Sequence, residues 1–156
     1  RRAAVKTLGA IGFDAVPPLV QALTSSNNVT VRGSAAKALA QVAINYPDEP
    51  FPAEGLQGLK TALNNPNPVV HIATVMALGE IGSPVVDLLI EALQTTDNPA
   101  LAISLVNALA SIGDERGVGV LQALLQDEST DSYVRETANS ALSRLEMTSK
   151  FQRGER

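Results

Sequence analysis

The residue types that most often carry out enzyme chemistry are scarce in this 156-residue chain. There is no cysteine, which removes thiolate nucleophiles, disulfides and cysteine-bound metals, and His71 is the single histidine. Two adjacent acidic pairs, Asp48-Glu49 and Asp127-Glu128, fall in turn-rich segments, where solvated charges are expected rather than an acid–base couple. Neither a phosphate-binding glycine loop nor a metal-spaced set of carboxylates occurs. We therefore expect no catalytic residue, no metal and no cofactor.

Charge is spread unevenly along the chain, whose formal net charge is -4. Residues 1–60 hold six basic and four acidic side chains, whereas residues 61–115 hold six acidic side chains and no lysine or arginine. A surface that follows nucleic-acid phosphates needs excess positive charge, so no nucleic-acid partner is expected. The acidic middle would suit a protein partner with a basic patch, and the alternative is that these charges are simply solvated.

An internal repeat predicts the helices on which these charged side chains lie. Five segments align without a gap on one leucine, which recurs in steps of 31, 39, 31 and 33 residues. Apolar residues recur at spacings of three and four in these segments and in a second set between them, as in amphipathic helices, and the alternation of a strand is absent. Asn67-Pro68 and Asn98-Pro99 supply a cap and a first-turn proline to two of the helices. The aligned leucines are Leu8, Leu39, Leu78, Leu109 and Leu142.

The repeat predicts an all-α fold, an α-solenoid (superhelix) of about four and a half helical hairpins. Each hairpin leaves an apolar face that only its neighbour can cover, so the hairpins must stack. We expect one repeat domain over residues 1–149, an insertion loop over 45–52 and a polar tail over 150–156. The second helices of the hairpins are expected at about 1–12, 29–44, 68–82, 99–113 and 132–147.

The pattern V-R-x-x-A-A-x-x-L-G-x-I-G, with its 31-residue step, resembles the HEAT repeat. More narrowly, it is similar to the short HEAT-like repeats of the phycobilisome lyase group of cyanobacteria. This resemblance implies a role in loading, unloading or escorting bilin pigments and phycobiliproteins. The arginine that starts a second helix at Arg32 is replaced by His71 and Ala102, so a structural hydrogen-bonding role is expected for this histidine. Iron-binding hydroxylases built from similar repeats use several His–Glu pairs, which this chain lacks.

Second helices line the concave surface in solenoids of this kind, and their side opposite the core is the candidate binding face. Along this face the side chains form a ridge, on which Ile72, Met76 and Ile103 are apolar where polar residues are expected. Exposed apolar groups among polar ones mark contact sites. Tyr46 and Phe51 in the insertion loop are a second candidate contact. Two alternatives stay open: the ridge residues belong to the core, and the two rings cover the edge of the core. The candidate protein-binding residues are Ile72, Met76, Glu80, Ile103, Asn107, Tyr46 and Phe51.

Two functions from different classes remain. The first is a non-catalytic protein-binding scaffold or adaptor, such as an assembly or escort factor, whose partner carries a basic patch or is a phycobiliprotein. The second is a bilin lyase or pigment–protein processing factor. Residues 61–115 contain neither aromatic side chains nor the cations that would bind the carboxylates of a tetrapyrrole, so the scaffold is favoured.

The sequence also predicts where in the cell the protein is located. No run of about 20 apolar residues is present, so membrane insertion is not expected. No signal peptide is visible and cysteine is absent, so we expect a cytoplasmic protein. The chain does not begin with methionine, which suggests a fragment of a longer protein or a processed product.

Overall fold

The structure, a computed structural model, describes residues 2–152 and residue 154. These residues form α-helices and two short 3-10 helices, with no strand among them. They divide into two compact units, residues 1–81 and 82–156. The α-helices are α1 (Arg2–Ile11), α2 (Val16–Ser25), α3 (Val29–Asn45), α4 (Ala53–Leu63), α5 (Pro68–Ile81), α6 (Val86–Thr95), α7 (Pro99–Ile112), α8 (Arg116–Gln126) and α9 (Ser132–Gln152), and the 3-10 helices are η1 (Phe13–Ala15) and η2 (Ser83–Val85).

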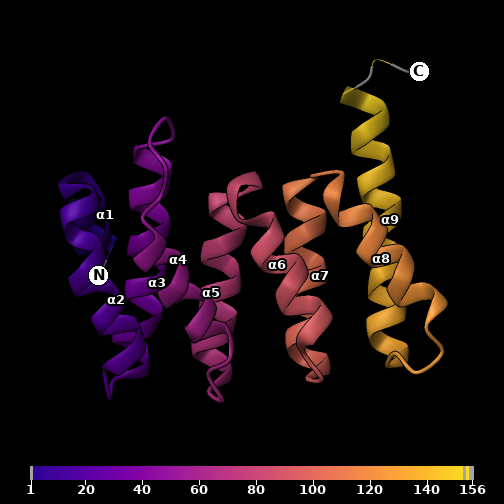
Figure 1. The fold of residues 1–156 in the computed structure, drawn as a ribbon, viewed down its shortest axis with the longest axis horizontal. Coiled ribbons are helices and arrows are strands. Elements are labelled where there is room, and N and C mark those ends of the chain that lie inside the picture. The colour runs from indigo at the N-terminus through magenta and orange to yellow at the C-terminus, as the bar shows by residue number, and fades with distance from the viewer. Residues whose placement is uncertain (1, 153, 155–156) are drawn as a thin grey trace. The chain divides into compact units, whose positions relative to one another are not determined.

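The first unit is built as two layers of helices. The second helices α1, α3 and α5 form one layer, in which α3 packs against α1 on one side and α5 on the other (Figure 1). The first helices α2 and α4 pack together as the other layer and against α3 and α5. Because α3 is enclosed on three sides, even its small residues Ala36, Ala38 and Ala40 are buried. Alanine at these positions allows the close approach of helices that the stacking requires.

The second unit repeats this arrangement with one second helix fewer. Helices α7 and α9 pack together, α6 packs against α8, and each first helix contacts the second helix of its own hairpin. The core contains fully buried leucines from all four helices of the unit. These leucines are Leu89, Leu105, Leu109, Leu121 and Leu145.

Side-chain caps define where the second helices begin. Asn28 and Asn98 are the N-cap residues of α3 and α7, and the side-chain oxygen of each accepts hydrogen bonds from two backbone N–H groups of the first turn. Asn67 Oδ1 accepts from the backbone N–H of Val69 at 2.9 Å at the start of α5. These bonds satisfy donors that an uncapped helix would leave free. Of the second-helix starts predicted at 29, 68, 99 and 132, all agree with the structure, whereas residue 1 lies outside the described residues.

Helix α9 is longer than predicted. It was expected to end near residue 147 and instead continues to Gln152, so the first part of the predicted polar tail is helical, and residues 153, 155 and 156 lie outside the described residues. No glycine or proline interrupts residues 132–152, so nothing in the sequence stops the helix there. Ser149 Oγ also donates to Glu115 Oε1 at 3.1 Å, which ties the extension to the start of α8.

Within residues 2–152, no single helix is long and apolar enough to cross a bilayer. The segments Arg2–Ile11 and Phe13–Ser25 meet the length and composition test only when taken together, and they are bent by 117° relative to each other.

Candidate functional site

An open groove with a volume of about 600 Å³ runs over the second-helix layer of the first unit. Each of the three helices in this layer supplies part of its wall, as their packing order α1, α3, α5 allows (Figure 1). The volume lies within the range of roughly 300–1,000 Å³ typical of small-molecule pockets. The groove is lined by Arg2, Val5 and Lys6 from α1, by Thr30, Gly33, Ser34, Lys37 and Gln41 from α3, and by Val69 and Ala73 from α5.

The charged part of the groove is entirely positive. Among the residues that the structure describes, Arg2, Lys6 and Lys37 are the ionisable ones in its lining, and no aspartate or glutamate lines it. All three side chains are exposed, and among the described residues no acidic side chain forms an ion pair with either lysine. Their charge is therefore available to an anionic ligand, and unpaired cations around a concave surface concentrate the positive potential there.

The floor of the groove is apolar and contains a glycine. Gly33 is buried where α3 meets α5, and a Cβ atom placed on it would lie 3.4 Å from the Cβ of Ala73. With these two small residues facing each other, the helices approach closely and leave a shallow surface that Val5 and Val69 flank. A ligand that combines anionic groups with a flat apolar body matches this combination of cations and apolar floor.

The width of the groove depends on how closely α1 approaches α3. Gly9 is buried in this contact, and a Cβ atom on it would lie 2.5 Å from Cγ of Gln41. Gln41 is held in place by its own hydrogen bond, which Nε2 donates to Asn45 Oδ1 at 2.9 Å. Gly9 thus allows Gln41 to line the groove without pushing α1 away from α3.

The predicted ridge residues lie on the surface, in both units. In the first unit Ile72 and Met76 are 44% and 54% exposed, and Glu80 is exposed one turn further along α5. In the second unit Ile103 is partly exposed, and the exposed Asn107 accepts a hydrogen bond from the Arg144 guanidinium at 3.1 Å. Ile72 and Met76 are therefore not core residues, and their role in protein binding stays a prediction.

The two aromatic residues of the insertion lie against the first unit. The Tyr46 ring packs on Phe13 with centroids 5.6 Å apart, and Phe51 meets Phe13 edge-on at 6.4 Å. The Tyr46 hydroxyl donates to the backbone carbonyl of Ala10 at 3.1 Å. Both rings are half-buried, and through them the insertion packs against the end of α1 and against η1. A role in partner binding stays a prediction for both residues.

Sequence reasoning missed Arg2 and Lys6, although the alignment contained the signal. Lys6 precedes Lys37 by 31 residues, one repeat step, so the two lysines occupy equivalent positions on adjacent second helices. Charge summed along the sequence does not show which cations are neighbours in space, and these cations lie outside residues 61–115. The packing of α1 on α3 brings cations from residues 2–37 together in space.

His71 does not line the groove. It lies on the buried side of α5 with 4% of its surface exposed, and its Nε2 atom has no hydrogen-bond partner among the described residues. The structural hydrogen bond expected from its position in the repeat is therefore not made by this atom. The arginine at the equivalent position does make one, because Nε of Arg32 donates to the backbone carbonyl of Ser26. No group of three or more metal-ligating residues occurs within the described part of the chain.

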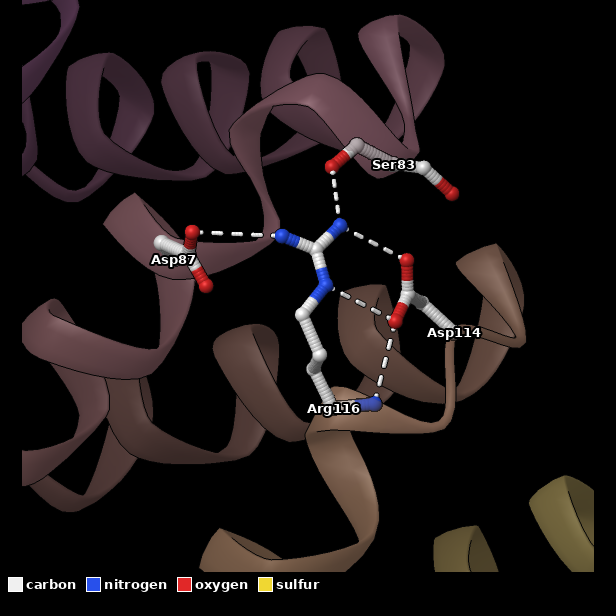
Figure 2. A network of polar contacts seen from close by, with 4 residues as sticks. All are labelled: Ser83, Asp87, Asp114 and Arg116. Atoms are coloured by element: carbon white, nitrogen blue, oxygen red, sulfur yellow. Dashed lines mark hydrogen bonds and ion pairs between the residues drawn. The ribbon is translucent and has the colours of Figure 1, made fainter.

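A network of polar contacts in the second unit ties η2, α6 and α8 together (Figure 2). The Arg116 guanidinium pairs with Asp114 at 2.8 Å and Asp87 at 3.2 Å and donates to the backbone carbonyl of Ser83 at 2.7 Å. Hydrogen bonds from the Arg116 side chain hold the pKa of Asp114 well below its ordinary value of 3.8, and Asp114 in turn raises the pKa of Arg116. All three guanidinium nitrogens of Arg116 are engaged in these contacts, so we interpret the network as a structural link between hairpins.

The sequence matches the HEAT-repeat family over residues 1–50 and 56–143. The chain belongs to this family. The predicted α-solenoid of HEAT-like hairpins is thus confirmed, in agreement with the helical structure. Human deoxyhypusine hydroxylase in complex with glycerol has a similar fold at 24% identity and a TM-score of 0.66, over 85% of this chain and 43% of that one. An engineered protein has a TM-score of 0.50 at 28% identity, over 86% of this chain and 63% of that one.

Two curated relatives show which proteins of the HEAT-repeat family this chain is similar to in sequence. Phycocyanin operon protein Z of Pseudanabaena tenuis is 72% identical over 153 residues, which cover 98% of this chain and 76% of the relative. Bilin biosynthesis protein CpeZ of Synechococcus is 34% identical over 149 residues, which cover 92% of this chain and 80% of the relative. The resemblance to the phycobilisome lyase-type repeat proteins is confirmed by these relatives.

These relatives correct the functional prediction. The non-catalytic scaffold favoured from the sequence is wrong, because a relative that matches nearly the whole chain is named for bilin biosynthesis. The prediction rested on the lack of cations in residues 61–115, and the cations of the groove lie outside that window.

Proposed function

We propose that this protein acts in bilin biosynthesis, in the processing by which an open-chain tetrapyrrole is prepared for or attached to a phycobiliprotein. The observation that carries the proposal is the 34% identity to bilin biosynthesis protein CpeZ over 92% of the chain. The match spans both compact units, so it concerns the whole repeat array rather than one hairpin.

The groove of the first unit supports the proposal on chemical grounds. A bilin is a flexible, mostly apolar tetrapyrrole that carries two propionate groups, so a site for it needs cations beside an apolar surface. Lys6 and Lys37 supply the cations, and the floor around Gly33 supplies the apolar surface. A pigment-processing role uses this combination of cations and an apolar surface.

The acceptor phycobiliprotein is proposed to contact the exposed ridge of α5. Ile72 and Met76 lie on the same helix as Val69 and Ala73 of the groove, one turn apart from each other. An apolar ridge beside a ligand groove allows one partner to bind close to the bound pigment. Glu80, Ile103, Asn107, Tyr46 and Phe51 are the remaining predicted contacts with the same partner.

Production of the chain in a bacterium that also makes a bilin and a phycobiliprotein subunit tests the proposed function. The measurement is the bilin absorbance that stays with the acceptor subunit after denaturing purification. We expect a higher yield of correctly chromophorylated subunit when the chain is present than when it is omitted. An equal yield with every phycobiliprotein subunit of the source organism would refute the function.

The ridge has its own test in the same system. Met76→Asp places a charge on the ridge, and Met147→Asp, on the exposed face of α9, is the matched control because Met147 is 66% exposed. Of the two variants, we expect only Met76→Asp to reduce complex formation with the acceptor and the yield of attached pigment. If both variants perform like the parent protein in the same helical state by circular dichroism, the ridge is not the contact.

A further inference from the structure

We infer that the groove between α1, α3 and α5 is the bilin site, and that Lys6 and Lys37 bind the two propionate carboxylates. The choice of ligand rests on the proposed function, whereas the choice of residues rests on the groove itself. The tetrapyrrole would lie on the floor formed around Gly33 and Ala73, with Arg2 as a third cation at the groove.

The repeat explains why two cations are presented together. Lys6 and Lys37 are one repeat step of 31 residues apart and project from the same position on α1 and α3, which pack side by side. Packed helices have axes about 8–10 Å apart, so two flexible lysine stems rooted at this spacing reach two carboxylates on one ligand. A single surface lysine provides no such pairing, and the equivalent position on α5 is the uncharged Met76.

A second groove of about 450 Å³, in the other unit, has a lining of opposite charge. Three carboxylates line it, from Asp97, Asp127 and Asp131, and no lysine or arginine is found in its lining within the described part of the chain. This groove would repel a dianionic ligand, whereas the groove of the first unit attracts one. Of these two grooves, the charge of the lining favours the groove of the first unit for the pigment.

Binding of a free bilin to the purified chain tests the site without any acceptor protein. Phycocyanobilin and its dimethyl ester serve as probes, because the ester keeps the tetrapyrrole and removes both carboxylate charges. Titrations are followed by the change in visible absorbance. We expect the free acid to bind the parent protein about fivefold to thirtyfold more tightly than the ester, which corresponds to two exposed ion pairs. Added salt should reduce this preference.

Variants of the lysines complete the test. Lys6→Ala with Lys37→Ala should weaken binding of the free acid by a similar factor and leave the ester unchanged. Arginine at both positions should preserve the preference for the acid. Lys150→Ala, at an exposed position on α9, is the matched control for loss of one lysine and should bind like the parent. Circular dichroism verifies that each variant keeps its helical content.

The outcomes separate this inference from the proposed function. If the acid and the ester bind alike, or if the double variant keeps its preference for the acid, the assignment of the lysines is refuted, even where the chain still promotes pigment attachment in cells. If the chain does not promote attachment but purified protein binds the acid through both lysines, the groove is supported and the proposed function falls. Failure of the parent protein to bind either probe overturns the site.

Discussion

Glycine-to-alanine substitutions test how closely the second helices of the first unit pack, which is the basis of the groove. Gly33 and Gly9 both lie within helices, so alanine removes the same unfavourable backbone entropy at both positions. They differ only in what the new methyl group meets. At Gly33 it would lie 3.4 Å from the Ala73 Cβ, an ordinary contact, whereas at Gly9 it would lie 2.5 Å from Gln41 Cγ and 3.1 Å from Gln41 Cβ.

The expected magnitudes follow from these distances. Gly33→Ala should raise the free energy of unfolding by about 0.5–1 kcal/mol, because the gain in helix propensity is not opposed by a clash. Gly9→Ala should lower it by about 1–2 kcal/mol, since overpacking costs about 1–3 kcal/mol and exceeds the same gain. For a chain of this length, 1 kcal/mol corresponds to about 2–4 °C in Tm.

Thermal unfolding followed by circular dichroism measures both effects. Gly119→Ala in α8 is the reference for helix propensity alone, because a Cβ atom there meets nothing within 4 Å. We expect Gly119→Ala and Gly33→Ala to raise Tm by similar amounts and Gly9→Ala to lower it. A fall in Tm for Gly33→Ala alongside a rise for Gly119→Ala would refute the α3–α5 spacing. A rise for Gly9→Ala would refute the close contact with Gln41 that shapes the groove.

Three further substitutions test other parts of the fold. Asp114→Asn should lower Tm near neutral pH, because it removes the carboxylate that Arg116 stabilises. A carboxylate with a lowered pKa stabilises the fold above the ordinary pKa of 3.8, and this stabilisation is lost as the pH falls through the folded-state pKa, so the difference in Tm from the parent should shrink in scans below about pH 4. A difference that persists at lower pH would contradict this. Tyr46→Phe should cost about 0.5–1.5 kcal/mol in urea unfolding by losing the bond to the Ala10 carbonyl, and an unchanged midpoint would show that the bond contributes nothing. Asn98→Ala should cost about 1 kcal/mol because its side chain caps α7 through two backbone N–H groups, with Asn98→Asp expected to retain most of the stability.

Much of the fold was predictable because its signals are local. The spacing of apolar residues determines which face of each helix is buried, and an asparagine before the first turn marks where a second helix begins. The same periodicity, counted back from Leu78, predicted Ile72 and Met76 on the face opposite the core and left a core position as the alternative; in the structure both are exposed. The end of α9 was missed because polar residues alone do not stop a helix; the first breaker in that region is Gly154.

The candidate site was less predictable because it depends on three helices at once. A single exposed lysine such as Lys37 does not identify a ligand site. Only the packing of α1 on α3 brings Lys6 beside it, and only the facing pair Gly33 and Ala73 leaves an apolar floor below them.

By itself, the sequence determined the repeat, the helices and their buried faces, because each depends on residues that lie within a few turns of one another. The tertiary structure decided which charges share a surface. In the second-helix layer of the first unit, side chains one repeat apart in sequence are neighbours, so a chain with a net charge of -4 presents a groove whose charged lining residues, among those the structure describes, are all cations.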